Sequence, residues 1–343
     1  MAPTIRQFTP KHASAWDNFV TAAPNGTFFH RIGWRHVIEA AFRHHPHYVL
    51  AEQDGAVTGI LPLVHVKSAL FGNRLLSLPF CVYGGPLATE AESTTALVDH
   101  SIDLAKRLSA RVIEFRAREP IVDGWTTRSD LYATFRKSIS SDPEENLKAI
   151  LRKQRAVVRK SLDSKLDVSF DTDVERFHRI YAESVRNLGT PVFSRKYIRL
   201  LMDSFRDCAE ITTISDSNAP IASVLSFYFR DEVLPYYGGG RPQARRRAAY
   251  DLMYWEVMKR ASERGARIFD FGRSKFGTGS FAFKKNWGFS PQALTYQYWI
   301  QPGYKVPDHN PLNPKYRIMI NAWKRLPLPL ANLIGPAIVR GIG

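Results

Sequence analysis

Hydrophobic and polar positions follow an order that is written twice along the chain. The first half predicts, in order, helices over 11–22 and 34–42, strands over 47–52 and up to Val66, an apolar run over 75–80, a helix near 92–108 and a strand over 112–115. An Asp54-Gly55 dipeptide separates the first two strands, and such a pair between apolar runs predicts a hairpin turn.

The second half repeats this order. It predicts helices over 173–187 and 195–206, strands over 210–215, 220–229 and 233–236, a helix over 247–264 and a strand over 268–271. Two signatures recur: Tyr83-Gly84-Gly85 returns as Tyr237-Gly238-Gly239, and Glu114 before a phenylalanine returns as Asp270. Order and spacing favour duplication over coincidence, so Tyr83 is expected to superpose on Tyr237 and Glu114 on Asp270.

This repetition predicts an α/β fold of two tandem lobes, each with a mixed α+β sheet covered by helices. The lobes are expected over 1–141 and 167–305. A basic helix over 142–166 would connect them, and residues 306–343 would form a tail.

The chain is strongly basic, with a formal net charge of +16. This surplus attracts polyanions such as nucleic acid, phosphorylated small molecules or an anionic membrane, or it reflects a generally basic surface. Cys81 and Cys208 form no disulfide framework, and Met1 to Pro10 lacks an apolar signal segment, so a cytoplasmic location is expected. The His44-His45-Pro46-His47 run has no further ligand residues nearby, so no metal site is expected.

The expected connecting helix has three arginines on one face. Arg152, Arg155 and Arg159 are spaced i, i+3 and i+7, which brings their side chains together on a helix. Two interpretations remain open, a solvated basic face and a face that binds a phosphate-bearing ligand.

The segment from Asp270 to Phe289 holds the richest candidate chemistry. A predicted strand ends at Asp270 and opens into a glycine-rich, cationic loop with Arg273, Ser274 and Lys275. Ligands of open α/β sheets bind beyond strand ends, so these three residues are expected to bind substrate and Asp270 to act in catalysis. Lys284 can stabilise a developing oxyanion. The same sequence pattern is also typical of a plain β-turn whose lysines face solvent, and this interpretation remains open.

A second candidate for substrate binding is the run Tyr237-Gly238-Gly239, just before a predicted helix. Glycines there can turn backbone N–H groups toward an anion at the helix N-terminus. A plain strand-to-helix turn explains the run equally well.

The charge-free stretch over 326–339 is expected to be interrupted by its prolines, and it is too short to span a bilayer. Lys324, Arg325 and Arg340 flank it. It is expected either to dock at a membrane interface or to pack on the adjacent domain.

The chain resembles FemAB-related proteins associated with PEP-CTERM/exosortase systems. The resemblance covers nearly the whole sequence and rests on these runs: Phe269-Asp270-Phe271-Gly272-Arg273-Ser274-Lys275, Gly277-Thr278-Gly279, Phe283-Lys284-Lys285-Asn286-Trp287-Gly288-Phe289, Arg152 to Lys160, and Leu326 to Asn332.

This resemblance implies two GNAT-like acyltransferase lobes. It further implies transfer of an amino acid from aminoacyl-tRNA to an amine of a peptidoglycan precursor, with Lys284 near the reacting ester. The exosortase-linked branch can instead use an exopolysaccharide or another envelope precursor. The chain lacks the R-x-x-G-x-G/A acetyl-CoA signature after the third strand of either lobe, and it has no long coiled-coil insertion for tRNA.

The sequence therefore favours a FemAB-type N-acyltransferase whose donor is aminoacyl-tRNA or acyl-CoA. Its expected partners are a phosphorylated or nucleotide-linked precursor, tRNA, and the inner membrane through peripheral contact of the tail. Two alternatives stay open, an acyl-CoA-dependent GNAT N-acyltransferase and a non-catalytic nucleic-acid-binding protein.

Overall fold

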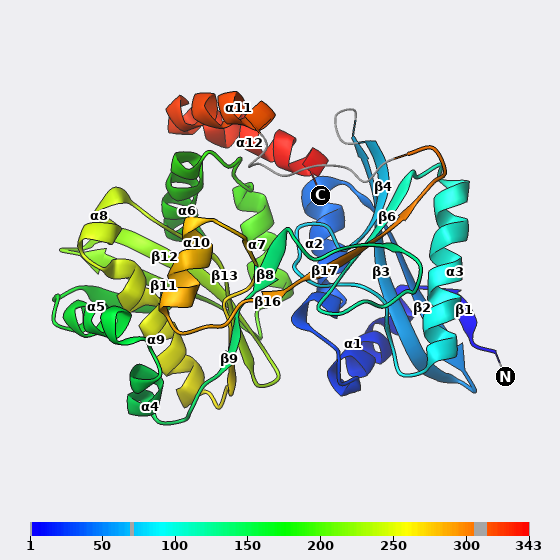
Figure 1. Cartoon of the computed structure of the whole chain (residues 1–343), viewed down its shortest axis with the longest axis horizontal. Coiled ribbons are helices and arrows are strands. Elements are labelled where there is room, and N and C mark those ends of the chain that lie inside the picture. Colours follow the sequence, from blue (N-terminus) through cyan, green and yellow to red (C-terminus); the bar gives the residue numbers. More distant parts are fainter. Residues whose placement is uncertain (1, 69–71, 305–313, 343) are drawn as a thin grey trace. The chain divides into compact units, whose positions relative to one another are not determined.

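The computed structural model describes residues 2–68, 72–304 and 314–342 (Figure 1). They fold as two compact units. Unit 1 takes in the described residues within 2–131, 293–304 and 340–342, and unit 2 takes in those within 132–292 and 314–339.

Unit 1 is built on one sheet. Its strands are β1 (Thr4–Gln7), β2 (His45–Gln53), β3 (Ala56–Ser68), β4 (Gly72–Ser77), β5 (Leu87–Ala88), β6 (Val112–Ala117), β7 (Thr126–Arg128) and β17 (Thr295–Ile300). Its helices are α1 (Ala13–Ala22), α2 (Gly33–Phe42) and α3 (Ala91–Arg107). The strands are ordered β1-β2-β3-β4-β6-β17-β7, with β5 beside β3.

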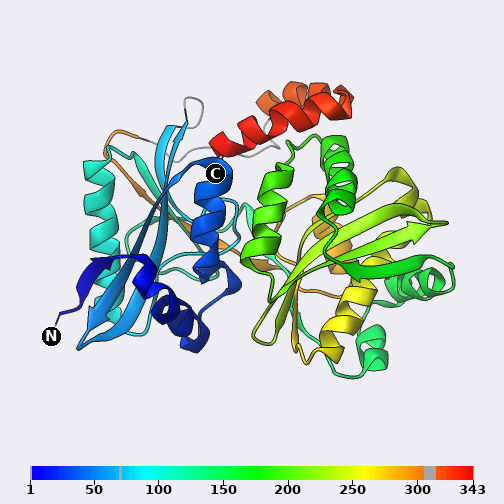
Figure 2. The ribbon, with the colours of Figure 1, turned by 180° about the vertical axis from the view of Figure 1, so that it is seen from behind.

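The predicted hairpin between β2 and β3 is confirmed. Asp54 and Gly55 have φ values of 51° and 81°, the positive values that a two-residue hairpin turn requires. Alternate residues of β2 then face opposite sides of the sheet. Val49 packs in the core cluster that includes Leu97 of α3, whereas the Tyr48 ring stacks on Trp16 of α1 at 5.2 Å. Helices therefore cover both faces of the sheet (Figure 2).

Unit 2 contains the remaining elements, except that β16 and α12 each run across the division between the units. Its strands are β8 (Tyr132–Thr134), β9 (Arg136–Ser138), β10 (Asp167–Asp171), β11 (Ala209–Asp216), β12 (Ala219–Phe229), β13 (Glu232–Gly240), β14 (Ile268–Asp270), β15 (Ser274–Lys275) and β16 (Gln292–Ala293). Its helices are α4 (Pro143–Lys148), α5 (Arg152–Leu162), α6 (Val174–Leu188), α7 (Arg195–Ser204), α8 (Pro242–Arg246), α9 (Ala249–Glu263), α10 (Gly279–Asn286), α11 (Pro314–Arg325) and α12 (Leu328–Ile342).

The main sheet of unit 2 repeats that of unit 1 strand for strand. Its order is β10-β11-β12-β13-β14-β9, which matches β1-β2-β3-β4-β6-β17. The two parallel pairs also correspond, since β4 runs parallel to β6 and β13 runs parallel to β14. The final pairs, β6 with β17 and β14 with β9, are both antiparallel. The expected tandem mixed α/β fold is confirmed.

The units divide the chain differently from the expected boundaries. Strand β9 was expected in the first lobe, over 1–141, but it pairs with β14 of unit 2. Strand β17 was expected in the second lobe, over 167–305, but it pairs with β6 of unit 1. Each sheet is thus completed by a strand from the other half of the sequence. The physical reason is that β6 and β14 each present an edge that an antiparallel neighbour can satisfy.

The expected connecting helix and tail also take other places. Helix α5, from the expected connector over 142–166, belongs to unit 2 and packs on α9. Of the expected tail, 306–313 lies outside the described residues, and α11 and most of α12 belong to unit 2. The prolines do not interrupt α12, because Pro329 lies in its first turn and Pro336 is accommodated inside it. No described helix combines the length and the apolar character needed to cross a membrane.

Candidate functional site

Strand β13 carries a bulge in the middle of unit 2. Ser226 of β12 pairs with Pro235, but Leu225 pairs with Tyr237, so Tyr236 is an extra residue in β13. Proline has no N–H to donate and is tolerated in strands mainly at edges and bulges. A bulge also bends its strand and increases its twist. The Pro235-Tyr236 pair therefore redirects β13 away from a regular ladder.

Strands β13 and β14 separate next to this bulge. They pair only at Glu232 with Ile268 and at Val233 with Phe269. Among the described residues, no strand pairs with β13 beyond Val233 on the side away from β12. The ladder between β13 and β14 therefore ends at Val233 and Phe269.

The three glycines after Tyr237 lie inside β13, and not in a turn before a helix as the sequence suggested. They pair with residues of β12, and their neighbours explain why glycine is needed. A Cβ on Gly239 would lie 2.7 Å from the Ser184 Cβ of α6. A Cβ on Gly238 would lie 3.2 Å from the Tyr254 hydroxyl of α9. Helices from both faces thus approach the strand closely.

Tyr237 belongs to an aromatic cluster on the α6 and α7 side of the sheet. Its hydroxyl lies 2.7 Å from the Tyr197 hydroxyl, and its ring packs edge-on against Tyr181. The side chain is almost fully buried. The structure thus places Tyr237 in the core, while its backbone follows the bulge.

Asp270 ends β14 as a buried carboxylate with three partners. It accepts hydrogen bonds from the Thr134 hydroxyl at 3.2 Å and from the Gly272 amide at 2.7 Å. An ion pair joins it to Nε of Arg136 on β9 at 3.3 Å, and Arg136 also pairs with Glu232. The carboxylate therefore fixes the first turn of the loop that follows β14.

Lys284 holds the same loop from α10. Only 9% of this residue is exposed. Its ammonium donates to the carbonyl oxygens of Phe271, Gly272 and Arg273, at 2.7, 2.9 and 3.2 Å respectively. The two expected catalytic residues are thus brought together, on either side of one loop.

Burial lowers the pKa of Lys284 from 10.5 to about 7. The negative charge of Asp270 raises this pKa, and the positive charge of Arg273 lowers it further. Three carbonyl acceptors use all three N–H groups of an ammonium, so the observed contacts suit the protonated side chain. The balance makes Lys284 a lysine that titrates close to neutral pH.

The rest of the Phe283 to Phe289 motif packs behind Lys284. The Phe283 ring contacts Tyr254 of α9, and the indole N–H of Trp287 donates to Asp251 of the same helix at 3.2 Å. Gly288 has φ of 80°, and a Cβ there would lie 2.9 Å from the Ala149 carbonyl oxygen. The motif therefore fastens the loop after β14 to α9 and to the chain before α5.

Asp251 is a site residue that the sequence did not reveal. It is 7% exposed and accepts hydrogen bonds from Trp287 and from Gln154 of α5. Burial raises its pKa, and these two hydrogen bonds lower it. The available signal was a carboxylate among the apolar residues of the first two turns of α9.

Arg273 lies on the loop after β14, and Ser274 and Lys275 follow it as the short strand β15. The Arg273 guanidinium carbon and the Lys275 Nζ both lie over the Tyr132 ring, 4.9 Å and 5.2 Å from its centre. Both cations are half-buried. The Ser274 hydroxyl is buried without a hydrogen-bond partner. This part of the loop can bind a phosphate or carboxylate group.

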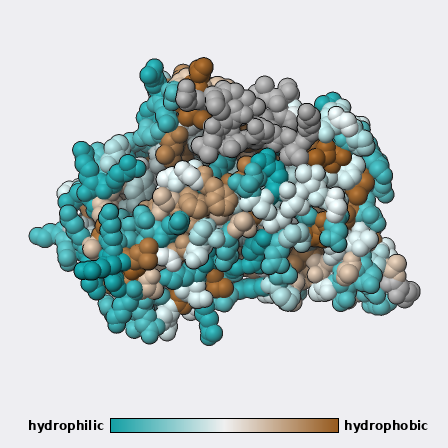
Figure 3. All heavy atoms as spheres, viewed as in Figure 1, coloured by the Kyte–Doolittle hydropathy of each residue, from teal (hydrophilic) through white to brown (hydrophobic). Residues whose placement is uncertain are grey.

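Arg152, Arg155 and Arg159 lie on α5, away from this loop in sequence but in the same unit. Arg152 and Arg159 are exposed, and Arg155 is half-buried and donates to the Lys148 carbonyl. The end of α5 adjoins α8, because Arg247 donates to the Ser164 carbonyl oxygen at 3.1 Å. We call the exposed cations of these two helices the α5–α8 basic surface; Figure 3 shows hydrophilic side chains there, and its members are Arg152, Lys153, Arg159, Lys160, Arg245, Arg246 and Arg247.

In unit 1, residues of the same unit occupy the position that corresponds to the gap between β13 and β14. Strand β4 ends at Ser77, and the amides of Gly84 and Gly85 donate to the Arg116 carbonyl oxygen of β6. The Arg116 side chain donates to Glu114. Tyr83 therefore lies outside a strand whereas Tyr237 lies inside one, so their expected superposition is wrong. Glu114 and Asp270 do correspond, each as the third residue of its strand.

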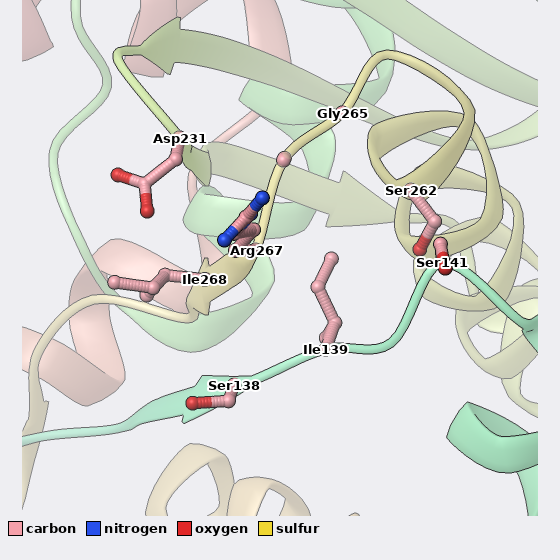
Figure 4. Close-up of a pocket in the computed structure, with 9 residues that line it drawn as sticks. Ser138, Ile139, Ser141, Asp231, Ser262, Gly265, Arg267 and Ile268 are labelled. Atoms are coloured by element: carbon pink, nitrogen blue, oxygen red, sulfur yellow. The ribbon is translucent and has the colours of Figure 1, made fainter.

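A cavity of about 580 Å³ lies elsewhere in unit 2 (Figure 4). Ser138, Asp231, Ser262, Arg267 and Ile268 are among the residues that line it. It adjoins the start of β14, whereas Arg273, Ser274 and Lys275 follow the end of this strand. None of the predicted site residues lines it.

Comparison with known proteins supports the tandem α/β fold described above. Residues 146–285 match the acetyltransferase (GNAT) domain family, and no curated protein sequence matches the chain. The structure of FemX is similar, with a TM-score of 0.67 at 16% identity over 87% of this chain and 97% of FemX.

Two further solved structures share the fold. The C-terminal domain of a putative lysylphosphatidylglycerol synthetase from Agrobacterium fabrum has a TM-score of 0.57 at 12% identity, over 85% of this chain and 92% of that domain. A tandem GNAT protein from the clavulanic acid biosynthesis pathway has a TM-score of 0.54 at 13% identity, over 89% of this chain and all of that one. The chain thus has a tandem GNAT-like fold, and residues 146–285 within it are similar to the acetyltransferase (GNAT) domain family.

Proposed function

We propose that this chain is an N-acyltransferase that transfers an aminoacyl or acyl group to an amine, and that the reaction takes place in unit 2. The observation that carries this proposal is the separation of β13 from β14 at the Tyr236 bulge. It lies within the segment that matches the GNAT family, and the loop after β14 brings Arg273 and Lys275 to the same end of β14. The equivalent place in unit 1 is closed by Gly84 and Gly85.

The donor we propose is aminoacyl-tRNA. A pyrophosphate such as that of CoA can bind backbone amides at the start of the helix that follows a strand, but several amides of the segment after β13 already have partners. The amides of Ala244, Arg247 and Ala248 donate to carbonyl oxygens inside the same segment. The α5–α8 basic surface offers an alternative place for the phosphates of a polyanionic donor.

The acceptor we propose is an amine of a cell-envelope or exopolysaccharide precursor with a phosphate or nucleotide group. Arg273 and Lys275 are the residues placed to meet that group. Two of the similar structures are FemX and a domain of a putative lysylphosphatidylglycerol synthetase. The structural similarity to FemX is consistent with the FemAB-like motifs in the sequence. Membership of the exosortase-linked branch is part of this proposal.

In the proposed reaction, the amine nitrogen attacks the ester carbonyl and forms a tetrahedral state with negative charge on oxygen. The C–O bond then breaks, and the donor hydroxyl leaves with the proton that the amine loses. We propose that this charge develops beside β13, where backbone groups can stabilise it, because β14 leaves this strand after Phe269. Lys284 acts as a positioning residue, because its three N–H groups already hold the loop that carries Arg273. Direct contact of Lys284 with the oxyanion, as the sequence suggested, would require it to release one of these carbonyls.

The experiment compares two labelled donors with the full chain. One is total tRNA charged with ¹⁴C-labelled amino acids, and the other is ¹⁴C-acetyl-CoA. The acceptors are a nucleotide-linked peptidoglycan precursor and an amino-sugar exopolysaccharide precursor. We expect label to reach the amine from aminoacyl-tRNA.

Other outcomes would replace the proposal with a stated alternative. Transfer from acetyl-CoA alone would identify an acyl-CoA-dependent N-acyltransferase. Binding of tRNA that weakens steeply with salt, without transfer to any acceptor, would identify a nucleic-acid-binding protein.

A further inference from the structure

Helices α11 and α12 expose large apolar side chains. Ile318 is 80% exposed, Met319 65% and Leu333 76%. Leu330 of α12 and Leu188 at the end of α6 are also exposed, at 42% and 69%. Scattered exposed leucines need no explanation, but this group is gathered on neighbouring elements, since α11 packs on α6. We call these five side chains the α11–α12 apolar face.

Helix α12 is apolar on both of its sides. Its inner side consists of Ala331, Gly335 and Val339, and a Cβ on Gly335 would lie 3.0 Å from the Val192 amide nitrogen. These small residues let α12 lie close against unit 2. The opposite side presents Leu330 and Leu333 to the surface. A helix that is apolar all round is buried in a protein or in lipid. Within the part of the chain that the structure describes, Ala331, Gly335 and Val339 of α12 are buried, whereas Leu330 and Leu333 are exposed.

The charged residues in the sequences of α11 and α12 are all basic. No acidic residue follows Asp308 in the sequence, whereas Lys315, Arg317, Lys324, Arg325 and Arg340 do. Lys324 and Arg325 end α11 and are exposed. Apolar residues flanked by lysine and arginine are typical of helices that lie in a membrane interface. In Figure 3, apolar surface lies along the edge of the molecule where Figure 1 places α11.

We propose that the α11–α12 apolar face rests on the surface of an anionic phospholipid bilayer. Leu330, Leu333, Ile318 and Met319 would enter the boundary between headgroups and acyl chains. Lys324 and Arg325 would meet the lipid phosphates. The 15 residues of α12 are fewer than the roughly 20 that a helix needs to span a bilayer, so the helix lies in the interface plane.

Charge decides between this partner and a second copy of the chain. Two copies that met through this face would place their Lys324 and Arg325 side chains near one another, with no carboxylate of α11 or α12 to offset them. Like charges at an interface disfavour association. An anionic lipid surface offers acyl chains to the apolar side chains of the face and phosphates to its cations. The inference holds whichever acyl donor the enzyme uses.

The α5–α8 basic surface is the competing site for anionic lipid. Two exposed leucines lie at the ends of α5: Leu151, just before the helix, at 54%, and Leu162, its last residue, at 44%. A variant of these leucines is therefore the matched control for a variant of the α11–α12 apolar face. Both variants remove two exposed apolar side chains and add two negative charges.

The test measures co-sedimentation of the full chain with vesicles. One set contains phosphatidylglycerol mixed with phosphatidylcholine, and the other contains phosphatidylcholine alone. We expect the wild-type chain to bind the first set and to bind the second much more weakly. Met319→Glu with Leu333→Glu should weaken binding roughly tenfold or more, because the inserted apolar area is lost. Leu151→Glu with Leu162→Glu should bind like the wild type.

A second variant tests the cations. Lys324→Glu with Arg325→Glu should weaken binding to phosphatidylglycerol vesicles, and added salt should reduce the difference from wild type. Circular dichroism melts confirm that each variant is folded.

Three results would overturn the inference. The first is equal binding of the Met319/Leu333 variant and the wild type. The second is loss of binding only in the Leu151/Leu162 variant, which would assign lipid binding to α5. The third is absence of vesicle binding together with a wild-type dimer in sedimentation velocity that the Met319/Leu333 variant lacks, which would assign the face to a second copy. Failure of acyl transfer in the donor assay would change none of these outcomes.

Discussion

Units 1 and 2 share a strand order but differ where a ligand could approach. In unit 1, the chain after β4 turns back and its Gly84 and Gly85 amides bond to Arg116 of β6. In unit 2, β13 continues as a strand to Gly240, and β14 leaves it after Phe269. The same fold therefore closes one sheet and opens the other. We propose that the open sheet of unit 2 carries the chemistry, while unit 1 repeats the architecture.

The buried carboxylates make the comparison sharper. Glu114 and Asp270 occupy the same strand position, and each is paired with an arginine. Glu114 pairs with Arg116 of its own strand, whereas Asp270 pairs with Arg136 of β9 and also holds the Gly272 amide. The same strand position thus holds a carboxylate in both units. In unit 1 this carboxylate lies beside a closed sheet edge, and in unit 2 it supports the loop that leads to Arg273 and Lys275.

The largest expected effect is that of Lys284→Met in unit 2. The change removes the ammonium that holds the carbonyls of Phe271, Gly272 and Arg273. Turnover should fall by about 10²–10³, because the loop loses its position in the transition state. Lys285→Met is the control, since Lys285 is exposed on the same helix. Turnover of Lys284→Met within a few fold of wild type would show that the loop needs no such support.

The next effect compares glycines of the two units. Gly84→Ala would place a Cβ 2.7 Å from the Ser77 carbonyl oxygen, and Gly239→Ala would place one 2.7 Å from the Ser184 Cβ. Each should cost about 1–3 kcal/mol of unfolding free energy in denaturant titrations. At a temperature where both are folded, only Gly239→Ala should lower turnover. Gly279→Ala, with nothing near its Cβ, should change neither quantity. Lower turnover in folded Gly84→Ala would assign chemistry to unit 1 as well.

The third effect is on binding of the donor. Arg152→Glu with Arg159→Glu reverses two exposed charges of the α5–α8 basic surface in unit 2. Affinity for tRNA should fall roughly tenfold. The slope of log Kd against log salt concentration should decrease by about 0.7–0.9 for each phosphate contact removed. Lys106→Glu with Arg107→Glu in unit 1 makes the same net-charge change on exposed residues and should have little effect. Equal losses from both variants would show that only total charge matters.

The smallest effect is a dependence of stability on pH. Unfolded Lys284 keeps its proton up to about pH 10.5, whereas the folded side chain releases it at about pH 7. Unfolding therefore takes up a proton between these values, and the burial cost falls as pH rises through this window. The melting temperature of the wild type should rise relative to Lys284→Met from pH 7 to 9. A constant difference in melting temperature between the wild type and Lys284→Met over this range would contradict the lowered pKa. Lys285→Met is the control, and its melting temperature should follow that of the wild type throughout.

The order of elements could be predicted from the sequence because each depends on local patterning. Helices, hairpins and the correspondence of Glu114 with Asp270 all follow from periodicity and turn residues. The exchange of β9 and β17 could not be predicted, because both strands are short and their partners are far away in sequence. Tyr83 and Tyr237 have similar neighbours, but only the second precedes a glycine run that stays in its strand.

The sequence grouped several residues that the structure brings together, but it did not reveal their contacts. Asp270, Arg273, Ser274, Lys275 and Lys284 do come together around one loop. That the Lys284 ammonium faces three carbonyls depends on how α10 packs, which no local pattern encodes. Thr134 and Arg136 support Asp270 from strands far away in the chain, and neither stands in a recognisable motif.

The central claim is that acyl transfer occurs in unit 2, and one pair of variants tests it most directly. Arg273 follows β14 and lies over the Tyr132 ring, while Arg118 follows β6 and lies over the Tyr83 ring, and both are half-buried. Turnover is measured for Arg273→Gln and Arg118→Gln with the labelled donor and acceptor that the wild type uses. We predict a loss of about 10²–10³ for Arg273→Gln and near-normal turnover for Arg118→Gln. Near-normal turnover for Arg273→Gln with loss in Arg118→Gln would contradict the account and place the reaction in unit 1.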